Sequence, residues 1–289
     1  MRMKQDIPLR KLRTTHAEPL LSGQFTIREL KKLLAGGGMT QSLHRHDYFF
    51  ILAVEKGKGK HEIDFVSQPV TDYSIFIMRP GQVHQLTLDP HSNGYLLEFK
   101  PEFYFPGDKM TSSEWRRLSA LGKCKLTPTA FKHLMEPVSA ILKEYASRAE
   151  GYEKMIRAYL DLFFIGLLRQ RNRDGKDFSL RTYDQEQLGI FLDLLEMNFS
   201  TLKQTSEYAA RMYLSTYQLN KITKKGMGKT ASELINEQVI LEARRLLLAT
   251  SGQVGQISSQ LGYEDVSYFI RFFKKHTGYT PEAYRRHFS

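Results

Sequence analysis

The stretch that decides the fold lies near the carboxyl end and reads ISSQLGYEDVSYFIRFFKKHTGYTPEAYR, from Ile257 to Arg285. Ile257 and Leu261 lie four residues apart, so a short helix would bury both side chains. Gly262 follows and tolerates the positive φ at which such a helix ends. These residues predict a short helix that stops at a glycine turn.

A second helix is predicted after this turn. Asp265 or Ser267 can cap its start, and Phe269, Phe272 and Phe273 form an apolar stripe at i, i+3, i+4 spacing. The opposite face is polar and basic, with Ser267, Arg271, Lys274 and Lys275. Reading of a DNA major groove requires such a helix pair, although an ordinary helical hairpin with a solvated basic face has the same pattern.

The residues themselves decide between these interpretations. Leu-Gly-Tyr at 261–263, Ser-Tyr-Phe at 267–269, Arg-Phe-Phe-Lys-Lys at 271–275 and Gly-Tyr-Thr-Pro at 278–281 closely resemble the signature of AraC/XylS-type transcription regulators. The resemblance implies a helical DNA-binding domain with two helix-turn-helix units, preceded by a cupin-like domain that senses a small molecule.

Length and composition fit this reading. The chain has 289 residues, enough for about two domains, and its 41% hydrophobic and 25% charged residues are typical of a soluble globular protein. It contains no run of eighteen apolar residues and no signal-peptide pattern, so we expect a cytoplasmic protein without a membrane contact. The single Cys124 is expected to be a packing residue.

Positive charge gathers in the last third of the chain. The net charge is +11, and from Ser200 onward 13 Lys and Arg stand against 7 Asp and Glu, a balance of +6. The first 199 residues carry 29 against 24. The excess therefore coincides with the predicted DNA-reading region, as phosphate neutralisation by a double-stranded DNA partner requires.

The first 100 residues or so show strand patterns. Gln24–Leu30 alternates with period two, Tyr48–Val54 is an apolar run, and Arg79-Pro-Gly-Gln marks a turn. Short strands between Gly and Pro turns predict a small barrel or double-stranded β-helix.

Histidines flank two of these strands. His44-Arg-His46 and Pro80-Gly-Gln-Val-His84 have a layout that resembles the two motifs of cupins, but Phe49 and Phe50 stand where metal-binding cupins have a Glu. Three imidazoles can hold Zn²⁺ or Fe²⁺, whereas histidines in a barrel mouth are more often hydrogen-bonding residues. We expect no metal or other cofactor, and assign effector binding to His44, His46, Tyr48 and His84.

Helical periodicity follows from about 102 to 172. Leu134, Val138 and Ile141 belong to one amphipathic stripe, and Met155 to Leu167 forms a second, richly apolar one. The second stripe exceeds what one barrel face needs, and the resemblance implies a homodimer contact there; packing of both helices on their own barrel alone is the alternative. The predicted domains are 1–172 and 183–289, joined by a charged linker at 173–182.

A second, weaker helix-turn-helix precedes the first in the DNA-binding half. Ser215 can cap a helix that Gly226 would stop, and Tyr213 occupies the turn where many members of the family have Gly. The resemblance assigns base or sugar contacts to Tyr217, Asn220, Lys221, Ser267 and Arg271, and phosphate contacts to Lys224, Lys225, Lys274 and Lys275, with Ser215 at the same face.

One long helix should join the two units. Ala231–Ala249 contains no Gly or Pro, and nineteen residues span about 28 Å, close to the 34 Å or so between successive major grooves. One chain can then read two adjacent grooves.

The predicted fold is therefore α+β with two domains: a cupin-like β-barrel with a helical dimerisation segment, and an all-α double helix-turn-helix. The predicted function is a sequence-specific, effector-controlled transcription regulator and not an enzyme, with activation through RNA polymerase favoured over repression. The alternatives are a metal-dependent cupin enzyme with an accessory helical domain, and a regulator without an effector.

Overall fold

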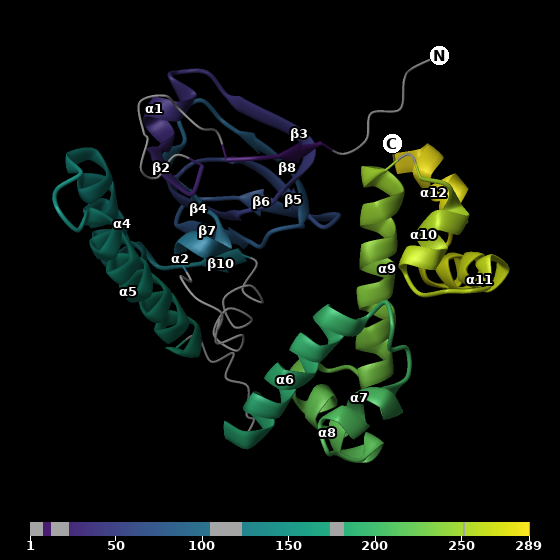
Figure 1. Cartoon of the computed structure of the whole chain (residues 1–289). Helices are drawn as coiled ribbons and strands as arrows, with labels where there is room; N and C mark the ends of the chain where they lie inside the picture. The colour runs from purple at the N-terminus through teal and green to yellow at the C-terminus, as the bar shows by residue number, and fades with distance from the viewer. Residues whose placement is uncertain (1–7, 13–22, 105–122, 174–181, 251, 289) are drawn as a thin grey trace. The chain divides into compact units, whose positions relative to one another are not determined.

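A computed structural model describes residues 8–12, 23–104, 123–173, 182–250 and 252–288. The chain divides into two compact units, one holding residues 9–177 and the other the chain from Phe178 onward (Figure 1). The linker predicted at 173–182 lies almost wholly outside the described residues, so its limits stay a prediction.

The first unit is built on two five-stranded sheets. In order across the first sheet stand β1 (Leu9–Arg10), β3 (Met39–His46), β8 (Val83–Leu88), β5 (Gly59–Ile63) and β6 (Val66–Val70). The second sheet runs β10 (Lys123–Lys125), β7 (Ser74–Met78), β4 (Phe49–Lys56), β9 (Asn93–Phe99) and β2 (Phe25–Glu29). Only β1 and β3 pair in parallel among the described strands; the other pairs are antiparallel. The predicted β-rich amino-terminal domain is confirmed.

Strand β4 explains the apolar run in the sequence. Its residues alternate between two cores, since Phe50 and Leu52 pack between the two sheets while Phe49 and Ile51 face helices on the other side. Both faces of the strand are buried, so neither face needs polar side chains.

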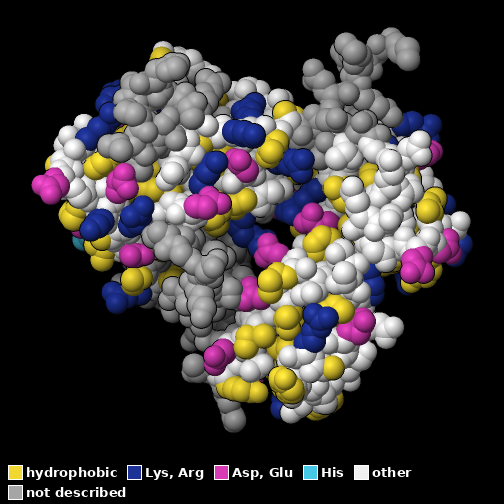
Figure 2. All heavy atoms as spheres, in the orientation of Figure 1, with side chains coloured by type: hydrophobic (Ala, Val, Ile, Leu, Met, Phe, Trp, Pro, Cys, Tyr) yellow, Lys and Arg dark blue, Asp and Glu magenta, His cyan; other side chains and the backbone are white. Residues whose placement is uncertain are grey.

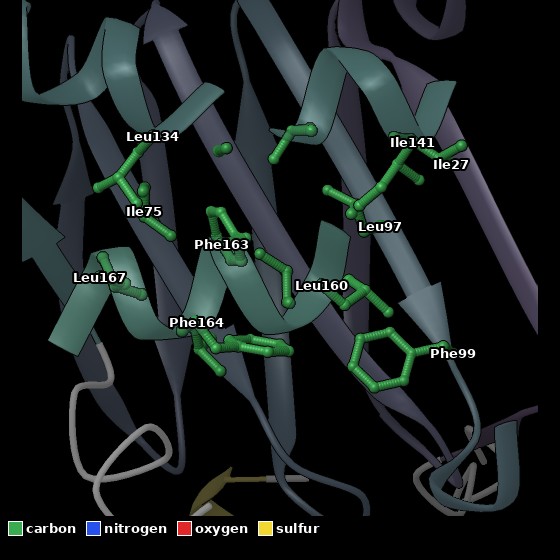
Figure 3. Close-up of a cluster of buried hydrophobic side chains, with 14 of the residues drawn as sticks. Ile27, Ile75, Leu97, Phe99, Leu134, Ile141, Leu160, Phe163, Phe164 and Leu167 are labelled. Atoms are coloured by element: carbon green, nitrogen blue, oxygen red, sulfur yellow. The ribbon is translucent and has the colours of Figure 1, made fainter. Parts of the chain in front are cut away.

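Helices α4 (Pro128–Ser147) and α5 (Tyr152–Arg173) cover the outer face of the second sheet. Figure 3 shows Leu134 of α4 and Phe163 of α5 directed at the sheet, where Ile75 and Leu97 lie. Two short helices, α1 (Leu30–Leu34) and α2 (Pro101–Tyr104), complete the described part of this unit. Burial of one stripe of each long helix fixes the sheet between two apolar layers.

The second unit is helical in its described residues. It comprises α6 (Thr182–Asn198), α7 (Thr205–Arg211), α8 (Thr216–Met227), α9 (Ala231–Ala249), α10 (Val254–Gln260), α11 (Val266–Thr277) and α12 (Pro281–Phe288). The predicted connecting helix coincides with α9. The predicted stop at Gly226 is wrong, because this glycine is buried inside α8 and the helix ends at Gly228, which has φ 71°. Within the described ranges, no helix is long and apolar enough to cross a membrane.

Candidate functional site

Helices α8 and α11, which the sequence predicts to be the reading helices, form a matched pair. Residues 216–227 of α8 recur 50 positions later as residues 266–277 of α11. Each helix starts at a side-chain cap, Ser215 or Asp265, and ends at a glycine in the left-handed region, Gly228 or Gly278. The shorter helices α7 and α10 precede them, and α9 lies between the two pairs in the chain (Figure 1). This repetition is what two helix-turn-helix units require.

The turns of the two helix-turn-helix units both contain a residue with positive φ, but the residue differs. Tyr213 has φ 56° and Gly262 has φ 77°, so both turns pass through the left-handed region. Tyr213 therefore adopts the backbone conformation for which Gly is preferred, and its side chain is 97% exposed. Because this conformation costs a non-glycine residue roughly 1–2 kcal/mol, the first turn carries strain that the second avoids.

The outward faces of both reading helices carry most of the predicted DNA contacts. Tyr217 is 75% exposed. The other exposed members of the predicted set are Ser215, Lys221, Lys224, Lys225, Ser267, Arg271, Lys274 and Lys275. Lys221 and Arg271 occupy equivalent positions, as do Lys224 and Lys274. A cation at the same place in each unit suits equivalent contacts with two stretches of the same duplex.

Some predicted contacts have partners inside the protein. The half-buried Asn220 accepts a hydrogen bond through Oδ1 from the backbone N–H of Ala231, 2.9 Å away, at the start of α9. The Ser215 hydroxyl accepts from the backbone N–H of Gln218 at the start of α8. Lys225 pairs with Asp184 of α6 at 3.4 Å. Asn220 is the member of the predicted set most clearly occupied by the fold.

The two helix-turn-helix units also contact each other directly. The ammonium of Lys203 donates to the backbone carbonyls of Phe199 and Leu261, and it lies 4.8 Å from the ring centroid of Tyr263. A Cβ built on Gly262 would lie 1.6 Å from the carbonyl oxygen of Ser200. We call this contact the Lys203 clamp. It holds the turn of the second helix-turn-helix against the loop before α7, so α9 is not the sole connection between the two helix-turn-helix units.

The barrel unit contains a cavity of about 730 Å³. Its wall includes His46, Tyr48, Glu98, Arg28 and Gln41, and it is completed by Arg10, Lys11, Leu12, Thr26, Ile27, Leu33 and Tyr145. Of the predicted effector residues, His46 and Tyr48 line this cavity, whereas His44 and His84 do not line it and lie against His46. The volume suits a small molecule.

Polar groups in the cavity wall are only partly satisfied. Glu98 pairs with Arg28 and accepts a hydrogen bond from the Tyr48 hydroxyl at 3.2 Å. Burial and the neighbouring Glu98 carboxylate raise the pKa of Tyr48, so its hydroxyl stays protonated and donates. Gln41 Oε1 and Arg28 Nε are buried and find no hydrogen-bond partner within the described chain. A buried acceptor and a buried donor at one cavity favour a polar ligand or water there.

Four buried histidines cluster behind this wall. The Nε2 atom of His84 lies 2.6 Å from Nε2 of His46 and 3.0 Å from Nε2 of His44, and its Nδ1 lies 2.9 Å from Nε2 of His61. Burial lowers the pKa of His44 to about 4 and those of His46 and His61 to about 3, with neighbouring imidazoles adding to the effect at His46 and His61. Burial lowers the pKa of His84 as well. All four side chains are neutral near pH 7.

Several residues of this region became apparent only in the structure. His61, Glu98 and Arg28 were not predicted, and neither was the Lys203 clamp. Glu98 had a signal, since it is a lone acid in the apolar strand Tyr-Leu-Leu-Glu-Phe at 95–99. His61 had none, because its neighbourhood depends on the pairing of β5 with β8.

Surface charge differs between the regions as the counts in the sequence predict. On the barrel unit, the face drawn in Figure 2 mixes Lys and Arg (dark blue) with Asp and Glu (magenta). Helices α8 and α11 contain no Asp or Glu, and their last turns carry Lys224 and Lys225 in α8 and Lys274 and Lys275 in α11.

Comparison with known proteins matches both units. The family model of the AraC-like ligand binding domain matches residues 35–150, and that of a helix-turn-helix domain matches residues 208–287. The first match covers most of the two sheets and α4, and the second runs from α7 into α12.

Relatives match the chain over part or most of its length. The HTH-type transcriptional activator RhaR of Pectobacterium carotovorum is 23% identical over 256 residues, which are 85% of this chain and 86% of that protein. The regulatory protein PocR of Salmonella typhimurium is 30% identical over 134 residues, 46% of this chain and 44% of that protein. A crystal structure of ToxT from Vibrio cholerae with bound unsaturated fatty acid is 18% identical, covers 91% of this chain and 95% of its own, and has a TM-score of 0.41. With matches to both an AraC-like ligand-binding domain and a helix-turn-helix domain, the chain belongs to the AraC/XylS family of transcription regulators.

Proposed function

We propose that this effector-controlled DNA-binding regulator reads two successive major grooves with α8 and α11 of one chain. The observation that carries the proposal is the matched pair itself: two reading helices of equal length, each with exposed cations at equivalent positions. Helix α9 has 19 residues, or about 28 Å, between them. The Lys203 clamp adds a second constraint on their spacing.

Selection of bound DNA from a random pool tests this proposal. Two short sequence elements with centres about ten base pairs apart are expected, because that distance is one turn of the duplex. Selection of a single element would contradict the use of both helices.

A salt series tests the assignment of phosphate contacts. Lys274→Gln should weaken binding to all sequences equally and reduce the slope of log K against log salt by about one.

The barrel cavity is the proposed effector site, and the protein is proposed to bind its effector without converting it. Gln41 and Arg28 offer a buried acceptor and a buried donor, and His46 and Tyr48 line the same space. A small molecule with both donor and acceptor groups fits this wall. A thermal-shift screen of polar metabolites tests it: a ligand at 100 times its Kd should stabilise the folded protein by about 2.7 kcal/mol, and Gln41→Leu should abolish that shift.

The proposed regulator acts as a homodimer in the cytoplasm, and activates transcription through RNA polymerase. Support for the dimer comes from α5, whose outer face exposes Met155, Leu162 and Ile165 at heptad-like spacing. Support for activation comes from RhaR and RhaS, relatives that are named transcriptional activators. Transcription in a purified system, with and without the protein on a template carrying its selected site, tests the activating role.

A further inference from the structure

We propose that the effector of this protein is a small organic anion that also carries a hydroxyl group. The assignment of this class rests on the barrel cavity being the effector site, as proposed above. Three cationic side chains belong to the cavity wall: Arg10, Lys11 and Arg28. Glu98 is the single carboxylate among the described residues of the wall. These four groups have a formal charge of +2, which a negatively charged ligand would offset.

The ion pair in the wall accounts for only one of the three cations. One carboxylate oxygen of Glu98 contacts the guanidinium of Arg28, and the other accepts a hydrogen bond from the Tyr48 hydroxyl at 3.2 Å. Both oxygens of this carboxylate therefore have a partner already. Since no other acid lines the described part of the cavity, the charges of Arg10 and Lys11 are not balanced within the wall.

Strand β1 holds these two cations at the cavity. It pairs in parallel with β3, with Arg10 in register with His46. Two residues later Leu12 is buried in the apolar core between the two sheets, which anchors the segment. Arg10 is half-buried and Lys11 is exposed, so an anion can meet one cation within the wall and the other at its solvent-exposed edge. A partly enclosed cation attracts an anion more strongly than one in open solvent does.

Arg28 keeps a donor for the ligand in spite of its ion pair. Its Nε is buried and has no hydrogen-bond partner within the described chain. A guanidinium carries five N–H donors in a planar fork that matches the oxygens of a carboxylate or a phosphate ester. Either group supplies both the negative charge and the acceptors that this wall needs, whereas a neutral polar ligand supplies acceptors alone.

Gln41 specifies a second group of the ligand. Its Oε1 atom is buried and has no partner among the described residues, and its amide nitrogen contacts the sulfur of Met39 at 3.5 Å. A buried acceptor lowers stability unless a donor reaches it. A carboxylate or phosphate group offers only acceptors, so the same ligand needs a separate donor. A hydroxyl group provides it without the positive charge of an ammonium, which Arg10 and Lys11 would repel.

Pairs of compounds that differ mainly in charge test this class. Calorimetry on the full chain compares D-gluconate with sorbitol, D-glucuronate with D-glucose, D-glucose 6-phosphate with D-glucose, and glycerate and glycerol 3-phosphate with glycerol. At least one anion should bind with one equivalent per chain and at least about 30-fold more tightly than its neutral counterpart. Preference for the sugar acids or glycerate identifies the anionic group as a carboxylate, and preference for the esters identifies it as a phosphate.

Single variants separate the charge from the hydroxyl group. Arg10→Gln should weaken binding of the anion at least about tenfold, and Arg10→Lys, which keeps the charge, should recover most of this loss. Gln41→Leu should weaken the anion and its neutral counterpart by the same factor, because it removes the acceptor for the hydroxyl that both share. Lys58→Gln removes an exposed cation of the same unit outside the cavity wall and should leave the affinity unchanged.

Three results would overturn this class of effector: a neutral compound that binds as tightly as its anionic counterpart, equal anion affinity in the natural chain and a folded Arg10→Gln variant, or no binding by any anion of the series. Far-UV circular dichroism establishes that each variant is folded. If Arg10→Gln does not fold, the ratio of anion to neutral affinity in the natural chain decides. A neutral ligand that stabilises the natural chain but not Gln41→Leu would leave the proposed effector site intact while removing the anion.

Discussion

Asn220 and Tyr217 lie three residues apart on α8 and have opposite surroundings. The Asn220 side chain accepts a hydrogen bond from the N–H of Ala231 at the start of α9, whereas the Tyr217 side chain is 75% exposed. A residue that is satisfied within the fold contributes mainly to stability, and an exposed one on a reading helix can contribute to DNA binding. The two roles separate in measurements on single variants.

We expect Asn220→Ala to lower the free energy of unfolding by about 1 kcal/mol, because one hydrogen bond at a helix start is lost. Tyr217→Ala should change stability by less than about 0.5 kcal/mol and weaken binding to the selected DNA by about tenfold, or about 1.4 kcal/mol. Urea unfolding and DNA titration of both variants check this. A Tyr217→Ala variant with undiminished DNA affinity would remove this residue from the interface.

The buried histidines make the barrel sensitive to acid. An unfolded histidine titrates near pH 6.5, whereas burial lowers the folded pKa of His61 to about 3. Below pH 6.5 or so the unfolded chain therefore binds a proton that the folded chain does not, and stability falls as pH drops toward the folded value. Each such histidine lowers the free energy of unfolding by up to about 1.4 kcal/mol for each pH unit of acidification in this window.

Urea unfolding between about pH 7 and pH 5, followed by circular dichroism, measures this loss. In His61→Gln the loss per pH unit should be smaller than in the natural chain by about 1 kcal/mol, whereas the exposed His91→Gln should behave like the natural chain. Identical pH dependence in all three proteins would mean that His61 is protonated as easily in the fold as in the unfolded chain.

The sequence predicted which residue types meet at these sites better than it predicted their partners. His44, His46 and His84 were grouped from their resemblance to the two cupin motifs, and in the structure they lie on β3 and β8, whose register brings them together. His61 joins them only through the pairing of β5 with β8, which no local pattern specifies. Asn220 was predicted to contact DNA because its hydrogen bond with Ala231 could not be predicted either. That contact depends on how α9 is oriented relative to α8.

At the scale of elements, the predictions rested on periodicity and end signals. Helix α9 matches its predicted range because it has a Thr230 cap and no internal breaker. The end of α8 was misplaced by two residues, since Gly226 and Gly228 are equally good stop signals in sequence and only packing around Gly226 distinguishes them. The Lys203 clamp could not be predicted, because it joins loops 58 residues apart.

Two glycines with the same backbone conformation provide a test of the clamp. Gly228 and Gly262 have φ of 71° and 77°, but a Cβ on Gly228 would meet no atom within 4 Å in the described chain, whereas one on Gly262 would meet the Ser200 carbonyl. Gly228→Ala should lower the free energy of unfolding by about 1 kcal/mol, the cost of the left-handed backbone alone.

Gly262→Ala should cost more than about 2 kcal/mol and also weaken DNA binding, because the second turn must move away from Ser200 and Lys203. Thermal unfolding and DNA titration of the two variants check this prediction. Equal destabilisation by both substitutions would show that the clamp adds nothing to the spacing of the reading helices.

At the scale of the whole molecule, regulation needs a connection between the barrel and the DNA. A ligand changes DNA binding only if it binds two states of the protein with different affinity. A dimer offers such states, since two chains present four reading helices whose joint use depends on the dimer contact. The surface suited to that contact is the outer stripe of α5, opposite the stripe that Leu160 and Phe163 bury against the sheet.

We therefore expect Leu162→Glu to convert a dimer into a monomer. Leu162 is 58% exposed at the middle of this stripe, and a charge there opposes burial against a second copy. Val66→Glu is the matched control, because Val66 is also 58% exposed but lies on β6.

Light scattering should give the mass of a dimer for the natural chain and for Val66→Glu, and of a monomer for Leu162→Glu. On DNA with two copies of the selected site, only Leu162→Glu should lose cooperative binding, while its affinity for a single site stays the same. A Leu162→Glu protein that remains dimeric would place the dimer contact elsewhere and leave the α5 stripe for another partner.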